Sequence, residues 1–220
     1  QYPSGGAVQP WVGLWRALAP SIGAIAPDIY GNDPGFVRDV LAAYHRSDNP
    51  LLVPEIAKPD SFAKYDFLAL GEGAIGVAPF GVDPHGWNIL GDVLAVGHAR
   101  NFALLAPMVR EIAKLNFEGK LKTSIEEPGQ AQQELDFGTW QATVSYGFPQ
   151  QDGRRSSGTN DAHGEALLAQ CGPDEFLVTG VDASVSFHVP GRLPGMRMQI
   201  LSAEEGSYDH GVWKPKRLWN

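Results

Sequence analysis

Three short apolar segments of the chain each end in polar or aromatic residues that suit binding and catalysis. The first ends at Asp28 and Tyr30, the second carries Glu55, and the third ends at Phe80 with Asp83 close behind. In parallel α/β proteins, catalytic residues gather at the carboxyl ends of the strands. The sequence therefore favours these three ends as the place of a functional site.

Glu55 is the strongest of these candidates because it directly follows the apolar string Leu-Leu-Val-Pro. A carboxylate at the mouth of an apolar sheet loses part of its hydration, so it needs either a partner or a function. As a functional group it would be a nucleophile or a general acid/base, the usual chemistry of glycoside hydrolysis. As a structural group it would cap the next helix or bind a neighbouring arginine.

The other candidates have two interpretations each. Tyr30 would either hydrogen-bond the Glu55 carboxylate and steady its charge, or pack as an aromatic at the strand end. Phe80 and Trp87 would form either a platform for the apolar face of a sugar or a hydrophobic lid. The two aspartates near these ends would either support and bind the substrate or cap loops.

No set of metal ligands or cofactor-binding motif stands out in the chain. The six histidines lack ligand spacing, so the sequence predicts no metal site. They are His45, His85, His98, His163, His188 and His210. The single cysteine, Cys171, excludes an intrachain disulfide and a cysteine-based zinc site. The absence of G-x-S-x-G, G-x-G-x-x-G and Walker patterns disfavours serine hydrolases and nucleotide-binding proteins.

The first half of the sequence alternates strand-like and helix-like patterns. The predicted strands are 22–30, 51–56 and 74–80, and the predicted helices are 11–19, 34–44, about 61–71 and 95–117. Asp33 is the predicted N-cap of the second helix, and Asp60 or Ser61 that of the third. Apolar strands alternating with helices predict a parallel sheet covered by helices, as in doubly wound sheets and TIM barrels.

The texture changes after Lys120, where short segments alternate apolar and polar residues. These segments are 140–146, 166–170, 175–179 and 184–189. They predict a small antiparallel β-domain, with the boundary at Gly119–Lys122. The expected domains are therefore 1–120 and 121–220.

Composition restricts the partners of the chain. It has 220 residues, of which 43% are hydrophobic and 19% charged, as in an ordinary globular protein. The formal net charge is −8 with no basic patch, so nucleic acid is not an expected partner. No apolar run approaches the roughly 18 residues of a membrane helix. The start QYPSGG carries no signal peptide and suggests a processed product or a fragment.

Beyond these patterns, the strings APDIY, NPLLVPEI and GAIGVAPFGVD occur in this order with a helix between each pair. This order resembles the last third of a clan A glycoside hydrolase barrel, most closely the bacterial β-galactosidase-like enzymes of families 35 and 42. The later strings LDFGTWQATVSYG, GPDEFLVTGVDASVSF and EEGSYDHGVWKPKRLWN resemble the β-sandwich appended to one branch of those enzymes.

The resemblance implies an α/β plus all-β fold: about strands six to eight of a TIM (β/α)8 barrel, then a small antiparallel β-sandwich. It implies a retaining hydrolase of terminal β-galactosides that needs no cofactor. Glu55 matches the nucleophile, Tyr30 the residue that orients it, and Phe80, with Trp87, Asp28 and Asp83, would shape the sugar site. Such enzymes are often exported, which implies a periplasmic or secreted protein.

One departure from the family pattern concerns the general acid/base, a Glu usually preceded by Asn. No Asn-Glu pair occurs in the chain. A whole barrel takes about 250 residues, so the first 120 cannot close one. We therefore expect this chain to carry only the nucleophile half. The missing N-terminal part of the barrel is then its expected partner.

Two other interpretations remain open at this stage. In the first, the β-domain binds carbohydrate or braces an inactive barrel remnant; exposed tryptophans would favour binding and buried ones bracing. Trp140, Trp213 and Trp219 are the residues that decide this, and the alternating pattern around Trp140 favours bracing. In the second, the chain is a self-contained small α/β fold with an unrelated activity.

Overall fold

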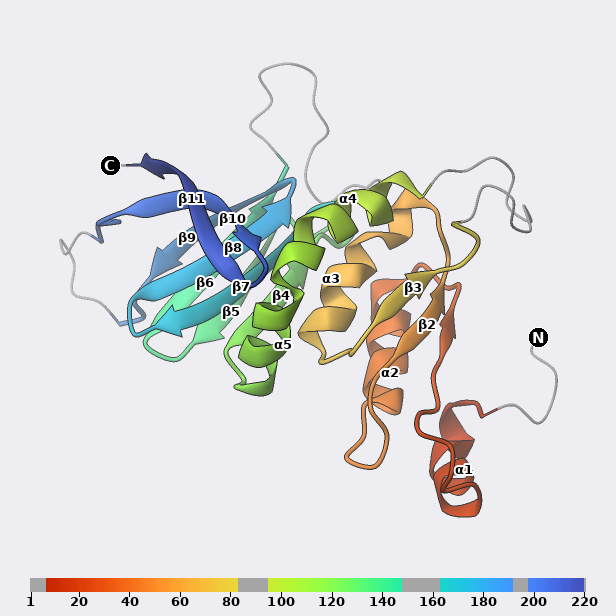
Figure 1. The fold of residues 1–220 in the computed structure, drawn as a ribbon. Coiled ribbons are helices and arrows are strands. Elements are labelled where there is room, and N and C mark those ends of the chain that lie inside the picture. Colours follow the sequence, from red (N-terminus) through yellow and green to blue (C-terminus); the bar gives the residue numbers. More distant parts are fainter. Residues whose placement is uncertain (1–6, 83–94, 148–162, 192–197, 220) are drawn as a thin grey trace. The chain divides into compact units, whose positions relative to one another are not determined.

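The computed structural model describes residues 7–82, 95–147, 163–191 and 198–219 (Figure 1). The chain forms two compact units, Gln1–His98 and Ala99–Asn220. The division falls inside helix α4 (Val96–Leu105), whereas the sequence placed the domain boundary at the end of the following helix. Helices, one parallel sheet and antiparallel sheets are all present, and the described residues form no closed barrel.

The first unit is built on three parallel strands. Its elements are η1 (Gln9–Trp11), α1 (Val12–Leu18), β1 (Asp28–Ile29), α2 (Pro34–Tyr44), β2 (Val53–Ile56), η2 (Asp60–Phe62), α3 (Lys64–Gly71) and β3 (Val77–Pro79). The strand order is β1-β2-β3, with both pairs parallel. The prediction of a parallel sheet with helices between its strands is therefore confirmed.

Helix α2 begins as its sequence predicts. The Asp33 side chain accepts a 2.8 Å hydrogen bond from the Phe36 backbone N–H, and Pro34 occupies the first helical position. Both features satisfy or remove backbone donors that a helix start leaves without partners. Val37 and Leu41 lie on the inner face of the helix and are fully buried.

The predictions for the first strand and for the N-cap of the third helix are wrong. Only Asp28–Ile29 of the segment 22–30 is a strand. Upstream, the Asn49 side-chain amide bonds both the N–H and the C=O of Ile25, at 2.8 and 2.9 Å, in place of a neighbouring strand. Asp60 does not cap its own helix; its Oδ1 instead accepts a 2.8 Å bond from the Gly97 N–H.

The long helix predicted over 95–117 is also interrupted. It consists of α4, the 3-10 turn η3 (Ala106–Met108) and α5 (Val109–Phe117). Pro107 lies in the turn and has no N–H to donate to the preceding helical turn, which breaks the α-helical ladder.

The second unit contains the antiparallel strands. They are β4 (Leu121–Ile125), β5 (Gln132–Phe137), β6 (Trp140–Tyr146), β7 (Glu165–Gly172), β8 (Glu175–Val181), β9 (Ala183–His188), β10 (Ala203–Asp209) and β11 (Val212–Trp219). They form the sheets β4-β7-β8 and β5-β6-β9 and the hairpin β10-β11. The prediction of antiparallel β structure here is confirmed, although the sequence reading missed β4, β5, β10 and β11.

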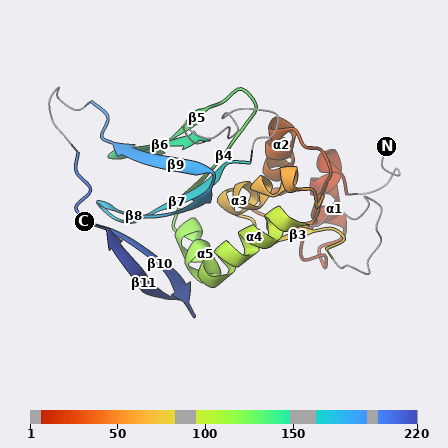
Figure 2. The same cartoon turned by 90° about the horizontal axis from the view of Figure 1, so that it is seen from above.

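The two three-stranded sheets pack face to face. Ala142, Val144 and Tyr146 of β6 form one buried cluster with Ala166 and Leu168 of β7. The intervening residues of β7 are buried as well, because α5 packs against this strand from the other side (Figure 2). Within the described residues, no helix is long and apolar enough to cross a membrane.

Candidate functional site

The candidate residues Tyr30, Glu55 and Phe80 occupy the carboxyl ends of three adjacent strands. Backbone bonds hold these ends together: the Ala57 N–H donates to the Ile29 carbonyl at 3.0 Å, and the Phe80 N–H donates to the Ile56 carbonyl at 2.8 Å. Because the strands are parallel, the three side chains start from the same edge of the sheet.

Tyr30 and Glu55 are in direct contact. The Tyr30 hydroxyl donates to Glu55 Oε1 at 2.5 Å. The carboxylate is half-buried, and the tyrosine is 45% exposed. This contact is one of the two interpretations that the sequence left open for Tyr30. The arrangement fixes one carboxylate oxygen and leaves the other, Oε2, outside that bond.

Asp28 lies directly beside Glu55 in the register of β1 and β2. Burial, and then the negative charge of Asp28, raise the pKa of the Tyr44 phenol. Asp28 thus acts on a tyrosine of helix α2, and its predicted contribution to substrate binding stays a prediction.

Trp87 and Asp83 lie outside the described residues, as does His85. Among the residues that the structure does describe, no group of three or more His, Cys, Asp and Glu side chains is arranged to hold a metal ion. The described strand ends bring together the Glu55 carboxylate, which Tyr30 orients, the neighbouring Asp28 and the aromatic ring of Phe80.

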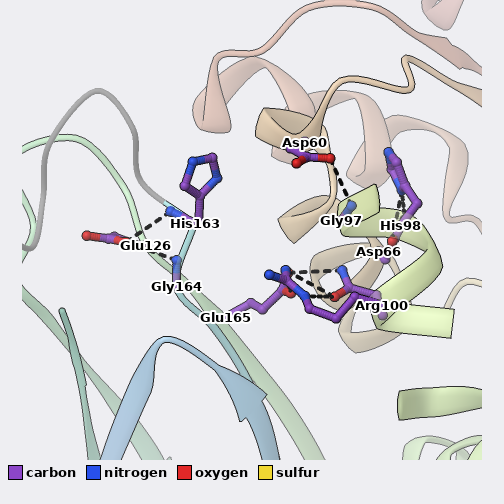
Figure 3. Close-up of polar contacts among 10 residues, drawn as sticks. Asp60, Asp66, Gly97, His98, Arg100, Glu126, His163, Gly164 and Glu165 are labelled. Carbon is purple, nitrogen blue, oxygen red and sulfur yellow. Dashed lines mark hydrogen bonds and ion pairs between the residues drawn. The ribbon is translucent and has the colours of Figure 1, made fainter. Parts of the chain in front are cut away.

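Sequence reasoning missed a buried polar cluster next to this edge. His98 Nδ1 lies 2.9 Å from Asp66 Oδ2, and His98 Nε2 lies 3.2 Å from the Ala57 carbonyl (Figure 3). Both side chains are almost fully buried. Both ring nitrogens face acceptors, an arrangement that suits an imidazolium against an ionised carboxylate. The pair attaches the start of α4 to the residue that follows β2.

Lys58 is the second residue that the sequence reading overlooked. It lies three residues beyond Glu55 and is only 8% exposed. Its Nζ donates to the Gly81 carbonyl at 3.5 Å, directly after Phe80. The clue in the sequence was the position of a lysine just past an apolar strand and before a proline.

The second unit has two buried carboxylates of its own (Figure 3). Glu126 Oε2 accepts from the backbone N–H groups of His163 and Gly164, at 3.0 and 2.9 Å. Glu165 accepts from Arg100 Nη2 at 2.8 Å and from Asn101 Nδ2 at 3.2 Å. These bonds join α4 to β7 and the end of β4 to the start of β7, so we assign both carboxylates a structural role.

The three tryptophans of the β-domain differ in their surroundings. Trp140 packs edge-on against Phe176 and donates to Asp174 Oδ1 at 2.9 Å. Trp213 packs against Tyr208 and donates to Glu204 Oε2 at 2.9 Å. Trp219 is half exposed and lies under the Arg217 guanidinium. All three rings are therefore engaged by neighbouring side chains.

Comparison with known proteins gives one family. A family profile described as "Domain of unknown function (DUF5597)" matches residues 98–220, more than half of the chain. The comparison with curated proteins found no match.

Proposed function

The chain belongs to the family described as a domain of unknown function (DUF5597), and on that premise we propose that it is the nucleophile-bearing part of a retaining glycoside hydrolase. The observation that carries the proposal is the Tyr30–Glu55 hydrogen bond at the carboxyl ends of neighbouring parallel strands. The proposed substrate is a terminal β-galactoside.

Glu55 would act through its carboxylate oxygen. It attacks the anomeric carbon, a glycosyl ester forms, and the bond to the leaving-group oxygen breaks with its electron pair on that oxygen. Tyr30 holds the carboxylate in one orientation, and Phe80 offers an apolar surface to the sugar ring.

The sheet β1-β2-β3 with α1, α2 and α3 would be the last three strands of a (β/α)8 barrel. The parallel pairing and the alternation of strand and helix support this. Retaining chemistry needs a second carboxyl group about 5–5.5 Å from the first. We propose that an additional segment of barrel supplies it, with the general acid/base.

The outer face of α1 supports this partner. Trp11, Leu14, Trp15 and Leu18 are all at least 37% exposed, at the spacing of one helical face. In addition, β1 and β3 each pair on one side only within the described residues. Exposed apolar stripes and open sheet edges mark surfaces that another segment covers.

The test is mechanism-based labelling of the protein as its gene encodes it. Dinitrophenyl 2-deoxy-2-fluoro-β-galactoside carries a leaving group that departs without acid assistance, so the reagent probes the nucleophile alone. Peptide mass spectrometry is expected to find the sugar on Glu55, and the Glu55→Gln variant is expected to remain unlabelled. A label on another carboxylate, or no label, overturns the assignment. Glu72→Gln, at an exposed carboxylate that follows helix α3, serves as the control.

A second candidate function is structural. Trp140 uses its ring and its N–H within the β-domain, which favours a bracing role for that domain over carbohydrate binding. The test is affinity electrophoresis through a gel that contains galactan. If the β-domain has a bracing role, the Trp140→Phe variant and the unmodified protein should migrate alike in this gel. A loss of retardation would instead favour binding by the β-domain.

A further inference from the structure

Lys58 is a buried cation that has no counter-ion among the residues that the structure describes. It is 8% exposed, and within the described part of the chain its Nζ donates one hydrogen bond, to the Gly81 carbonyl, which is long at 3.5 Å. Among the residues that the structure describes, no carboxylate lies within the 4.0 Å of an ion pair from its Nζ. The buried Asp66 carboxylate directs both of its oxygens to His98.

Such a group is costly to bury. An ammonium ion removed from water needs an opposite charge or a full set of hydrogen-bond acceptors. The Gly81 carbonyl is one acceptor at the outer limit of hydrogen bonding, and it is neutral. A structural role for this contact therefore does not explain why a charged side chain occupies the position.

The backbone fixes where this cation lies. On one side of Lys58, Ala57 bonds Ile29 through its N–H and His98 through its carbonyl. On the other side Pro59 favours extended backbone at Lys58. Gly81, which accepts from the ammonium, directly follows Phe80 at the end of β3. The ammonium thus lies at the same sheet edge as Glu55 and Phe80.

We propose that Lys58 Nζ binds an anionic substituent of the substrate, so that the site takes an acidic sugar bearing a carboxylate or a sulfate. A sugar hydroxyl would supply the ammonium with a hydrogen bond but with no opposite charge. An anionic oxygen supplies both. This inference rests on the proposed function, because it places a sugar against Glu55, and it refines the substrate from a neutral galactoside to an acidic one.

The experiment compares three monosaccharides: galactose, galacturonate and galactose 6-sulfate. Their dissociation constants are measured by calorimetry on the protein as its gene encodes it, and on Lys58→Met, Lys58→Arg and Lys64→Met. Methionine keeps the apolar stem of lysine and removes the charge. Lys64 is an equally buried lysine on α3 that packs over Tyr65, so it is the matched control.

We expect at least one acidic sugar to bind about tenfold or more tightly than galactose, the size of a charge-assisted hydrogen bond. The better of the two identifies the anion. Lys58→Met should abolish this preference, Lys58→Arg should keep part of it, and Lys64→Met should keep all of it. Because Lys58→Met removes a charge that no described carboxylate compensates, the melting temperature of this variant should not fall, whereas the loss of a purely structural lysine would lower it.

Two results would overturn the inference, and they differ from failure of the proposed function. The inference is wrong if galactose and both acidic sugars have equal dissociation constants. It is also wrong if Lys58→Met still prefers an acidic sugar to galactose. In either case fluorosugar labelling of Glu55 would still stand. If no sugar binds and Glu55 is not labelled, the proposed function itself is wrong.

Discussion

Glu55 and Tyr30 depend on each other at the scale of single residues. The phenol holds one carboxylate oxygen at 2.5 Å and thereby restricts the rotation of a side chain that is only half-buried. A positioned carboxylate attacks faster than a mobile one, because its orientation has been fixed before the reaction. Under the proposed function Tyr30 would be a positioning residue, and its effect should appear in the rate at which Glu55 reacts rather than in stability.

The first prediction concerns this hydroxyl. Tyr30→Phe removes one hydrogen bond to a charged group, so fluorosugar labelling of Glu55 should slow by about tenfold to a hundredfold. The melting temperature should stay nearly unchanged because Tyr30 is 45% exposed. Tyr44→Phe is the control, since the Tyr44 hydroxyl donates to the Ala7 carbonyl. An unaltered labelling rate in Tyr30→Phe would refute the positioning role.

Cys171 gives a second prediction at this scale, on pH dependence. Burial is the main cause that raises the pKa of its thiol, and the charges of Glu175 and Glu111 raise it further. A raised pKa leaves less thiolate at any pH below it, so iodoacetamide should modify the folded protein more slowly than the urea-unfolded chain. The pH at which the modification rate rises should be higher in the folded protein than in the unfolded chain. Since the chain has one cysteine, the readout is unambiguous. Coincident pH profiles for the two states would contradict it.

At the scale of elements, helix α4 is held by polar side-chain bonds on both halves of its length. His98 bonds Asp66 within the first unit, and Arg100 and Asn101 bond Glu165 within the second. Glu165 has no exposed surface, so its charge depends on these donors. Helix propensity alone would not position α4, because its register against β7 depends on which residue meets Glu165.

The third prediction tests this anchor. Arg100→Met should destabilise the protein by about 1.5–3 kcal/mol, the value of a hydrogen bond to a charged group. Urea denaturation measures it. The double variant Arg100→Met/Glu165→Gln should recover part of the loss, because no buried charge remains. Arg110→Met on the exposed face of α5 should change stability by less than about 0.5 kcal/mol. Equal effects of Arg100→Met and Arg110→Met would rule out the anchor.

At the scale of the whole molecule, the exposed apolar face of α1 is unusual, because globular domains normally bury such a face. Leu18 is 74% exposed and Leu14 is 50% exposed. An apolar stripe of this kind either receives another segment or promotes association.

The fourth prediction follows from that stripe. In the 220-residue chain, the double variant Leu14→Glu/Leu18→Glu should reduce self-association, measured by sedimentation velocity, and reduce binding of an apolar fluorescent dye. Its unfolding free energy should hardly change, because both side chains are already in water. Val212→Glu, at an exposed position of the β10-β11 hairpin, is the control. Equal self-association of the double variant and the unmodified chain would argue against α1 as the covered surface.

Sequence patterns were informative wherever local chemistry is decisive. The Asp33–Pro34 start of α2, the parallel strands and the β6 to β9 segments follow from caps and periodicity, which neighbouring residues determine. The placement of Glu55 and Tyr30 at strand ends followed for the same reason, because both residues end apolar runs, whereas the structure chose between a hydrogen bond and aromatic packing for Tyr30. These features need only the order of residues along the chain.

Other features depended on residues far apart in the sequence. The Asn49 side chain bonds Ile25 where a neighbouring strand was expected. Asp60 accepts from the Gly97 N–H instead of capping its own helix, and His98 bonds Asp66. The sequence carried no prediction for Lys58, whose side chain tertiary packing removes from water. The sequence by itself determined which residues could carry chemistry and on which strands they lie. Only the tertiary structure decided which polar groups became buried partners, because desolvation is created by contacts between distant segments and not by local spacing.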